Sequence, residues 1–347
     1  MEDTVRVVVL GTGQMGSGII KLLLEKQGIE IAGVYGRRAD RVGIDVGEVV
    51  GLGREIGVKL TNNLAELLEE ARPHIAIQAT CSKVVQAVDE IKTILNHGAN
   101  IVSIAEEISY PAYEAPQLAD EIHKLALEKG VTVVGTGINP GFVLDLLVIT
   151  LTGVCFSVES ITAQRINDLS PYGPSVLTTQ GVGITPEAFR KGVKDGSVVG
   201  HFGFPESISM ISKALGWKID KIEQNREPII SSVKRETPFV NIEPGHTAGC
   251  THTATAYMEG RPVINLVHPQ QVHPHLEDVQ TGDYIEIKGE PDVNFSGSPE
   301  IPGGVGTIAL AVNMIPRAIN AAPGLKSMME LPAPAAVMGD IRTLIKK

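Results

Sequence analysis

The sequence VRVVVLGTGQMG, residues 5–16, decides the fold of this chain. Its first part, VRVVVL, is a short apolar and β-branched run, which is typical of a strand buried on both faces. Glycines follow at positions 11, 13 and 16, and residues 17–27, rich in Leu, Ile and Lys, are compatible with a helix. In such a strand-turn-helix the first glycine allows the tight turn, the second lets a phosphate approach the backbone, and the third lets the helix pack against the strand.

The helix after the glycines would present free backbone N–H groups and the positive end of its dipole to a phosphate. We therefore expect a nicotinamide dinucleotide, NADP or NAD, to bind with its pyrophosphate against this turn. The alternative is a glycine-rich turn that binds nothing. The residues predicted to hold the cofactor here are Gly11, Thr12, Gly13, Gln14, Met15 and Gly16.

Strands and helices alternate outward from this turn. Right-handed crossovers convert such an alternation into a doubly wound parallel sheet of the Rossmann type. We therefore predict an α/β fold with an N-terminal Rossmann domain over residues 1–138. The predicted strands are 5–10, 29–35, about 57–60, 74–79, 100–104 and 131–135, and the predicted helices are 17–27, 63–70, 84–96 and 113–129.

The alternation breaks at GTGINPG, residues 135–141, and alternating polar and apolar runs follow. Such runs are typical of a largely antiparallel sheet. We predict a second, α+β domain over 139–302 that binds substrate and forms a dimer, and a C-terminal helical segment over 303–347 near the cofactor. Its helix, 303–322, is expected to kink or end at Pro316. The other predicted elements are strands at 160–166, 226–233, 251–258, 261–267 and 283–288 and helices at 142–153, 185–194 and 206–215.

The end of the second predicted strand bears on the choice of cofactor. NAD-binding proteins usually carry Asp or Glu there, about 20 residues past the glycine turn, to bind the ribose 2′-hydroxyl. Arg37 and Arg38 stand in that place, and guanidinium groups can bind a 2′-phosphate. We expect NADP to be slightly favoured, with dual use possible; the alternative is a solvated loop face. Thr80, after the fourth strand, and Thr307, at the glycine-rich start of the last helix, are further cofactor candidates.

Two adjacent carboxylates follow the fifth predicted strand. The carboxyl ends of parallel strands line the crevice in which a ligand lies, so Glu106 and Glu107 are expected near the nicotinamide. A partly desolvated carboxyl group has a raised pKa and can transfer protons. The alternative is that the pair caps the next helix or contacts water.

Composition disfavours several classes of protein. Hydrophobic residues make up 43% of the chain, which is too apolar for a disordered protein. Lys and Arg number 30 against 40 Asp and Glu, and this net charge of −10 disfavours nucleic-acid binding. The apolar stretch 142–156 is too short and interrupted for a membrane helix. The acidic start at residues 1–6 runs straight into a strand and has no signal-peptide pattern, and the three cysteines are scattered, so we predict a cytoplasmic protein.

Four segments carry a family likeness: the glycine turn, IVSIAEE at 101–107, GTGINPGF at 135–142 and QRINDLSPYG at 164–173. On these motifs nearly the whole chain resembles the diaminopentanoate dehydrogenase group, which is related to dihydrodipicolinate reductases and native amine dehydrogenases. The resemblance implies NAD(P)-linked oxidative deamination of 2,4-diaminopentanoate at C4 in ornithine fermentation. The products would be 2-amino-4-oxopentanoate and ammonia.

The resemblance also implies roles for single residues. Glu106, and after it Glu107, is the implied acid/base for the interconversion of amine, imine and carbinolamine. Arg165 and Asn167 fall on the first strand of the second domain, two apart and so on one face, and Tyr172 follows in the next loop. Arg165 can bind a substrate carboxylate through two hydrogen bonds. The alternatives are a surface ion pair for Arg165 and a packed aromatic for Tyr172.

The histidines are weighed as metal ligands and as substrate ligands. Five of the nine lie between positions 246 and 275, but zinc sites use tighter Cys/His spacing, and we predict no metal. His201 and His268 are instead candidates for binding the substrate, and others are expected as neutral, buried residues.

Three alternatives to this function stay open. Residues 268–275, HPQQVHPH, lack the lysine and the Ser-Gly-Thr stretch of dihydrodipicolinate reductases, so imine reduction is the weaker reading. An amine or amino-acid dehydrogenase with another substrate is the second alternative, and an NAD(P) sensor without turnover is the third.

Overall fold

The computed structural model describes residues 4–346, which form two compact units. The first unit runs to Phe142 and resumes at Gly304, and the second spans Val143–Gly303. The limits expected from the sequence are 138/139 and 302/303. Of the acidic start over residues 1–6, in which we expect no signal peptide, residues 1–3 lie outside the described residues. No helix within residues 4–346 is long and apolar enough to cross a membrane.

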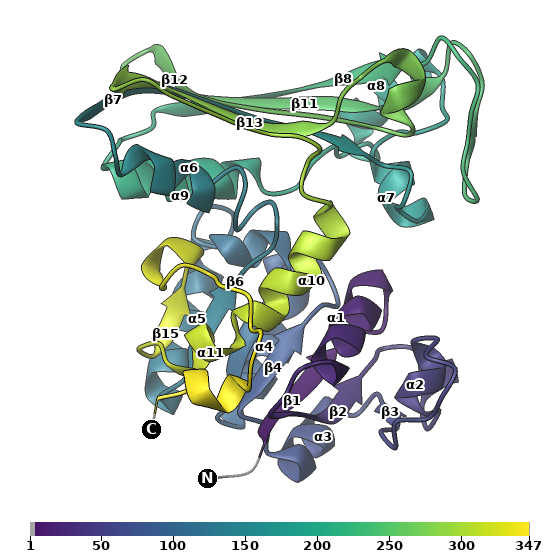
Figure 1. The fold of residues 1–347 in the computed structure, drawn as a ribbon, viewed down its shortest axis with the longest axis vertical. Coiled ribbons are helices and arrows are strands. Elements are labelled where there is room, and N and C mark those ends of the chain that lie inside the picture. Colours follow the sequence, from purple (N-terminus) through teal and green to yellow (C-terminus); the bar gives the residue numbers. More distant parts are fainter. Residues whose placement is uncertain (1–3, 347) are drawn as a thin grey trace. The chain divides into compact units, whose positions relative to one another are not determined.

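The first unit is built on a seven-stranded sheet in the order β15-β6-β5-β4-β1-β2-β3. Every neighbouring pair in this sheet is parallel, which confirms the predicted doubly wound Rossmann-type sheet. In Figure 1 the unit contains the purple and blue strands and the yellow C-terminal segment. The strands predicted from the sequence are β1 (Val5–Leu10), β2 (Ile29–Tyr35), β3 (Leu60–Thr61), β4 (Ile75–Gln78), β5 (Asn100–Ser103) and β6 (Thr132–Gly135).

The helices of this unit begin and end near their sequence signals. α1 (Gln14–Leu24) begins inside the glycine turn, before the predicted start at 17, because Gly13 is its N-cap. The side chain of Asn63 caps α3 by accepting from the backbone N–H of Glu66, as its position before an apolar run predicts. The remaining bounds are α2 (Val46–Val49), α3 (Leu64–Ala71), α4 (Val84–Asn96), α5 (Pro116–Lys129), and the 3-10 turns η1 (Ala39–Arg41) and η2 (Glu106–Ser109).

The C-terminal segment differs from the single helix expected over 303–322. It forms α10 (Gly303–Asn313) and α11 (Ile315–Ile319), and Pro316 lies in the first turn of α11, where its missing N–H is tolerated. The chain then forms β15 (Gly324–Lys326), which pairs in parallel with β6. This strand is an addition to the predicted sheet. The 3-10 turns η4 (Met328–Glu330) and η5 (Ile341–Leu344) follow it.

The second unit is built on a six-stranded sheet in the order β14-β13-β7-β12-β11-β8. All neighbouring pairs are antiparallel except β7 with β12, so the predicted largely antiparallel sheet is confirmed. Figure 1 shows α6 and α9 side by side along this sheet. The bounds are β7 (Ser157–Asp168), β8 (Lys221–Ile230), β11 (Thr247–Met258), β12 (Arg261–Gln271), β13 (Gly282–Glu290), β14 (Val293–Gly297), α6 (Leu146–Thr152), α7 (Pro174–Thr179), α8 (Pro186–Asp195), α9 (Phe204–Leu215), η3 (Pro274–Glu277) and the separate pair β9 (Arg235–Glu236) and β10 (Asn241–Ile242).

One side of β7 is buried, and its chemistry changes along the strand. Ile161 and Ala163 are buried and apolar, whereas Arg165 and Asn167, which continue the same alternation, are buried and polar. Burying polar side chains costs free energy unless they are hydrogen-bonded. The carboxyl half of β7 therefore marks a polar site inside this unit.

Candidate active site

The glycine turn has the shape of a phosphate-binding loop. Gly11 adopts φ +107°, and a Cβ built on it would lie 2.5 Å from the carbonyl oxygen of Ala79, so this position accepts only glycine. A Cβ at Gly16 would collide with the backbone of Gly11. No atom lies within 4 Å of a Cβ built at Gly13, so space for an approaching phosphate remains there.

The N-terminus of α1 suits an anion. Its N-cap Gly13 has no side chain to cap the helix, and no acidic residue lies in the first turn. Backbone N–H groups at such an end carry partial positive charge. The carbonyl oxygen of Thr12 accepts from the hydroxyl of Ser17 at 3.3 Å, and a Cβ at Gly304 would contact Cε of Met15 at 3.3 Å. These residues fit the pyrophosphate of a dinucleotide, with Gln14 as the first residue of the helix.

The two threonines predicted for the cofactor have hydrogen bonds within the first unit. The hydroxyl of Thr307, on α10, accepts from the backbone N–H of Ile138 at 3.2 Å, just after β6. Thr80 follows β4, and its hydroxyl donates to Oε2 of Glu90 at 2.5 Å. Both remain candidates for cofactor binding.

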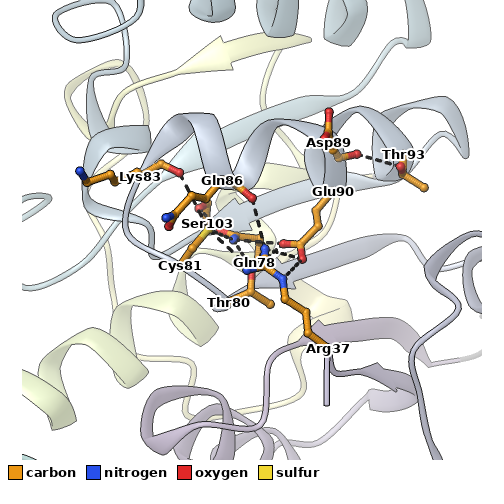
Figure 2. A network of polar contacts seen from close by, with 10 residues as sticks. All are labelled: Arg37, Gln78, Thr80, Cys81, Lys83, Gln86, Asp89, Glu90, Thr93 and Ser103. Atoms are coloured by element: carbon orange, nitrogen blue, oxygen red, sulfur yellow. Dashed lines mark hydrogen bonds and ion pairs between the residues drawn. The ribbon is translucent and has the colours of Figure 1, made fainter. Parts of the chain in front are cut away.

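Arg37 is held in a polar network at the end of β2. Its Nε and Nη2 lie 2.9 and 2.8 Å from Oε1 of Glu90, and Nη2 also donates to the hydroxyl oxygen of Thr80 at 3.3 Å. Figure 2 shows the Glu90 carboxylate extending from α4 toward both residues. The carboxylate side chain is 9% exposed and the guanidinium side chain 46%, so the pair joins the interior to the surface.

Arg38 has a different environment. It pairs with Asp40 at 2.7 Å, and both side chains are mostly exposed. An exposed pair of this kind contributes little to stability and is screened by salt. Each of the two arginines that we predicted for a 2′-phosphate therefore already has a carboxylate partner.

Glu106 opens η2, directly beyond β5. Burial raises the pKa of this carboxyl group, and the charge of Glu107 adds to the rise, while hydrogen bonds from its own backbone N–H and from Ser82 act in the opposite sense. A carboxyl group with a raised pKa keeps a proton more readily and can act as an acid as well as a base. Glu106 therefore has the environment of an acid/base.

Glu107 has a structural contact that Glu106 lacks. Its Oε2 accepts from the backbone N–H of Val84 at 2.8 Å, in the first turn of α4, whose N-cap Lys83 makes no side-chain cap. Burial also raises the pKa of Glu107, and the charge of Glu114 adds to this rise, opposed by the bond from Val84. The alternative weighed for the pair was a cap on the next helix, but Glu107 instead bonds to the start of α4, which precedes it in the chain.

Arg165 forms a buried ion pair in the second unit. Its Nη1 donates to Oδ1 of Asp283 at 2.6 Å, its Nη2 donates to the carbonyl oxygen of Ile301, and both charged side chains are almost fully buried. Oδ2 of Asp283 accepts from the backbone N–H of Ile301 at 2.9 Å. The two nitrogens that we expected to bind a substrate carboxylate thus have partners within the chain. A substrate contact of Arg165 stays a prediction.

His268, on β12, lies beside this pair with one nitrogen unused. Its Nε2 lies 2.9 Å from Oδ1 of Asn167, while its buried Nδ1 has no hydrogen-bond partner. Because Oδ1 of Asn167 accepts, Nε2 carries the proton and Nδ1 keeps a lone pair. Burial, and then the charges of His201 and Arg165, lowers the pKa of His268 well below its usual value, so the ring is neutral.

His201 and Tyr172 complete this cluster. The rings of His201 and His268 contact edge to face with centroids 4.9 Å apart. Burial, followed by the charge of Arg165, lowers the pKa of His201 to about 3. A Cβ at Gly303 would touch the hydroxyl oxygen of Tyr172 and lie 3.8 Å from Nη2 of Arg165. The structure therefore brings the five predicted substrate residues together within the second unit: Arg165, Asn167, Tyr172, His201 and His268.

Two further histidines, His252 and His273, have structural contacts. Nδ1 of His252 accepts from the backbone N–H of His201 at 3.0 Å, and burial lowers the pKa of this imidazole to about 2. His273 contacts the hydroxyl of Ser170 and the carbonyl oxygen of Glu236 at 2.9 and 2.8 Å. Within residues 4–346 no three His, Cys, Asp or Glu side chains are placed to hold a metal ion.

Sequence reasoning missed two acidic partners, Glu90 of Arg37 and Asp283 of Arg165. Glu90 occupies the apolar side of α4, between the buried Ala87 and Ile94, and a charged residue on such a stripe was an available signal. Asp283 had no such signal, because it lies at the start of an ordinary alternating strand and its partner Arg165 is 118 residues away. The polar residues Gln78 and Ser103, buried at strand ends, were also missed.

Comparisons with known proteins agree with this architecture. A family model described as the 2,4-diaminopentanoate dehydrogenase C-terminal domain matches residues 142–347, and one described as the dihydrodipicolinate reductase N-terminus matches 5–104. A 2,4-diaminopentanoate dehydrogenase of Acetoanaerobium sticklandii is 46% identical over 347 residues, which cover 99% of this chain and 98% of that protein. The chain belongs to the 2,4-diaminopentanoate dehydrogenase family.

Amine dehydrogenases are also relatives of this family member. One from Streptomyces virginiae is 25% identical over 356 residues, covering 96% of this chain and 98% of the relative. A solved amine dehydrogenase structure from Mycobacterium smegmatis superimposes with a TM-score of 0.85 at 29% identity, covering 95% of this chain and 97% of that one. The family resemblance stated from the sequence is confirmed, and the chain is an NAD(P)-dependent dehydrogenase.

Proposed function

We propose that this diaminopentanoate dehydrogenase family member oxidatively deaminates 2,4-diaminopentanoate at C4, giving 2-amino-4-oxopentanoate and ammonia. The observation that carries the proposal is the 46% identity, over 99% of the chain, to the A. sticklandii enzyme of that name. The side-chain clusters around Glu106 and His268 support it, since the first suits proton transfer and the second suits an amino acid.

Glu106 is the proposed acid/base. A nicotinamide dinucleotide held at the glycine turn would supply the acceptor for the hydride that leaves the carbon carrying the amino group. Glu106 takes a proton from the substrate ammonium beforehand, and afterwards moves protons as water adds to the imine and ammonia leaves. Its raised pKa supports this role because the group then exchanges protons closer to neutrality. Glu107 keeps the start of α4 in place by its bond to Val84.

The proposed substrate site is the cluster in the second unit. The lone pair on Nδ1 of His268 accepts an N–H of a substrate amino group, which gives this buried nitrogen the partner it lacks. His201 and His268 are neutral at physiological pH and therefore do not repel an ammonium group. Arg165 and Tyr172 orient the substrate carboxylate, and Asn167 fixes the ring of His268.

For the cofactor we propose that NADP is slightly favoured and that NAD is also used. Arg37 and Arg38 support a 2′-phosphate, because guanidinium groups bind phosphate oxygens in pairs. Glu90 and Asp40 neutralise these arginines and so support tolerance of NAD. We also propose that the protein is a homodimer and that it is cytoplasmic. Light scattering on a sizing column tests the dimer, and cell fractionation tests the location.

The test is reduction of NADP or NAD by the purified protein in the presence of 2,4-diaminopentanoate, followed by the absorbance of the reduced nicotinamide. Turnover with release of ammonia is expected, and turnover without ammonia would exclude deamination. The two amine dehydrogenase relatives favour a second candidate, an amine dehydrogenase with another substrate. If the diamino acid gives no cofactor reduction and a simple amine does, that second candidate would be established instead.

A further inference from the structure

A buried carboxylate stands behind the arginine that follows β2. Glu90 lies on the apolar side of α4, and its Oε2 accepts from the hydroxyl of Thr80 at 2.5 Å and from Nε2 of Gln78 at 3.4 Å. Burying an ionised carboxylate is costly unless charge and hydrogen bonds compensate. Arg37 supplies the compensating charge through two nitrogens. The network therefore depends on this pair.

A second layer fixes the carboxylate to the strand ends (Figure 2). Nε2 of Gln78 donates to the hydroxyl oxygen of Thr80 at 2.7 Å, and the hydroxyl of Ser103 donates to Oε1 of Gln78 at 2.5 Å. Gln78 and Ser103 are fully buried at the ends of β4 and β5. Glu90 is thus held from behind, and it holds Arg37 in turn.

This arrangement limits what Arg37 offers to a ligand. Nε and Nη2 face Glu90, and Nη2 also donates to the carbonyl oxygen of Gln86 at 3.2 Å. Nη1 makes none of the contacts with Glu90, Thr80 and Gln86, but the guanidinium has a further side-chain hydrogen bond with Cys81, so few of its donors remain for a ligand. The charges of Arg37 and Glu90 cancel. A neutral pair attracts the 2′-phosphate dianion of NADP only weakly, and it does not weaken the binding of the uncharged ribose 2′-hydroxyl of NAD.

We propose that Glu90 sets the balance between NADP and NAD by binding and neutralising Arg37. It is a specificity-determining residue that acts through Arg37 and touches neither substrate nor reacting atoms. The inference rests on the NAD(P)-dependent function proposed above. The proposed role of Glu90 explains how Arg37 and Arg38 can follow β2 in a protein that also uses NAD, as proposed above.

The experiment measures dissociation constants for NADP and NAD by calorimetry, without amine substrate. In Glu90→Gln the amide fills the same space without the charge. We expect NADP to bind about tenfold more tightly, equal to about 1.4 kcal/mol, and NAD to change by less than about twofold. The matched control is Glu121→Gln, which removes a carboxylate on α5 that pairs at 2.7 Å with Lys92 on α4, the helix that carries Glu90, and it should leave the ratio unchanged.

A double-mutant cycle tests whether Glu90 acts through Arg37. In an Arg37→Gln background, Glu90→Gln should no longer change the NADP to NAD ratio. Weaker NADP binding in Glu90→Gln, an equal change for both cofactors, or the same change without Arg37 would overturn the proposal. If thermal melting shows that Glu90→Gln does not fold, Glu90→Asp decides, because its shorter carboxylate withdraws from Arg37; a ratio that does not rise would refute the inference.

The design separates this inference from the proposed function. Failure of the unmodified protein to bind either dinucleotide would refute both. Normal dinucleotide binding without turnover of the diamino acid would refute only the proposed substrate. The ratio of NADP to NAD affinity in Glu90→Gln would still decide the role of Glu90.

Discussion

Asp283→Ala is the sharpest test of how the second unit is held together. The change removes the carboxylate that pairs with Arg165 at 2.6 Å and that accepts from the backbone N–H of Ile301 at 2.9 Å. Both charged side chains are almost fully buried, so water does not replace the lost partner. We expect the free energy of unfolding to fall by about 3–5 kcal/mol, the usual cost of removing one member of a buried pair.

The magnitude follows from what remains behind. A hydrogen bond to a charged group contributes about 1.5–3 kcal/mol, and two such bonds are lost. The pair itself is a weak source of stability, because burial raises the pKa of Asp283 despite the opposing charge of Arg165. The loss therefore comes from an unpaired, buried guanidinium. Replacing both residues, Arg165→Met with Asp283→Leu, should restore most of the lost stability.

The assay is urea unfolding followed by circular dichroism. Glu286→Ala is the control: it lies on the same strand, β13, and its exposed carboxylate pairs with Lys288 at 2.9 Å. An exposed pair contributes about 0–1 kcal/mol. A loss for Asp283→Ala that is no larger than for Glu286→Ala would refute the reasoning about burial.

The other predictions concern the two glutamates and one histidine. Glu106→Gln should lower kcat by about 10²–10⁴-fold while calorimetry finds cofactor affinity within about threefold, and unchanged kcat would exclude Glu106 as the acid/base. Glu107→Ala should instead destabilise the protein by about 1 kcal/mol in urea unfolding, through the lost cap of α4, with kcat reduced less than for Glu106→Gln. The pKa of His201 is lowered from 6.5 to about 3, so the unfolded chain binds the extra proton and stability should fall as pH drops through this range. His201→Gln should flatten that fall in unfolding midpoints, and an unaltered profile would contradict the buried, neutral ring.

Local signals in the sequence predicted the first unit well. The run VRVVVL and the glycines after it specify a strand, a tight turn and a helix within a few residues, and β1 and α1 follow that order. Asn63 indicated the start of α3, because its side chain caps the first turn of that helix. Such elements depend on neighbours in the chain, which a sequence displays directly.

Features that depend on distant partners escaped prediction. β15, only Gly324–Lys326, is a strand because β6 supplies its hydrogen bonds, and nothing in three residues announces this. The helix expected over 303–322 is interrupted, and Pro316 begins a second helix instead of bending one. At the candidate site the predicted residues of β7 and β12 do lie together, but the register of the parallel β7–β12 pair that aligns them could not be predicted from local sequence.

The two arginines singled out for ligand binding show what sequence reasoning leaves out. It recognised Arg37 and Arg165 as cations suited to a phosphate and a carboxylate, and it weighed a solvated loop face for Arg37 and a surface ion pair for Arg165, but not a buried acidic partner for either. Their acidic partners lie 53 and 118 residues away. Because each cation is already compensated, net positive charge does not govern what these sites accept. Each carboxylate orients its arginine and decides which nitrogens stay available to a ligand. We therefore expect ligand selectivity at either position to change as strongly when the acid is replaced as when the arginine is replaced.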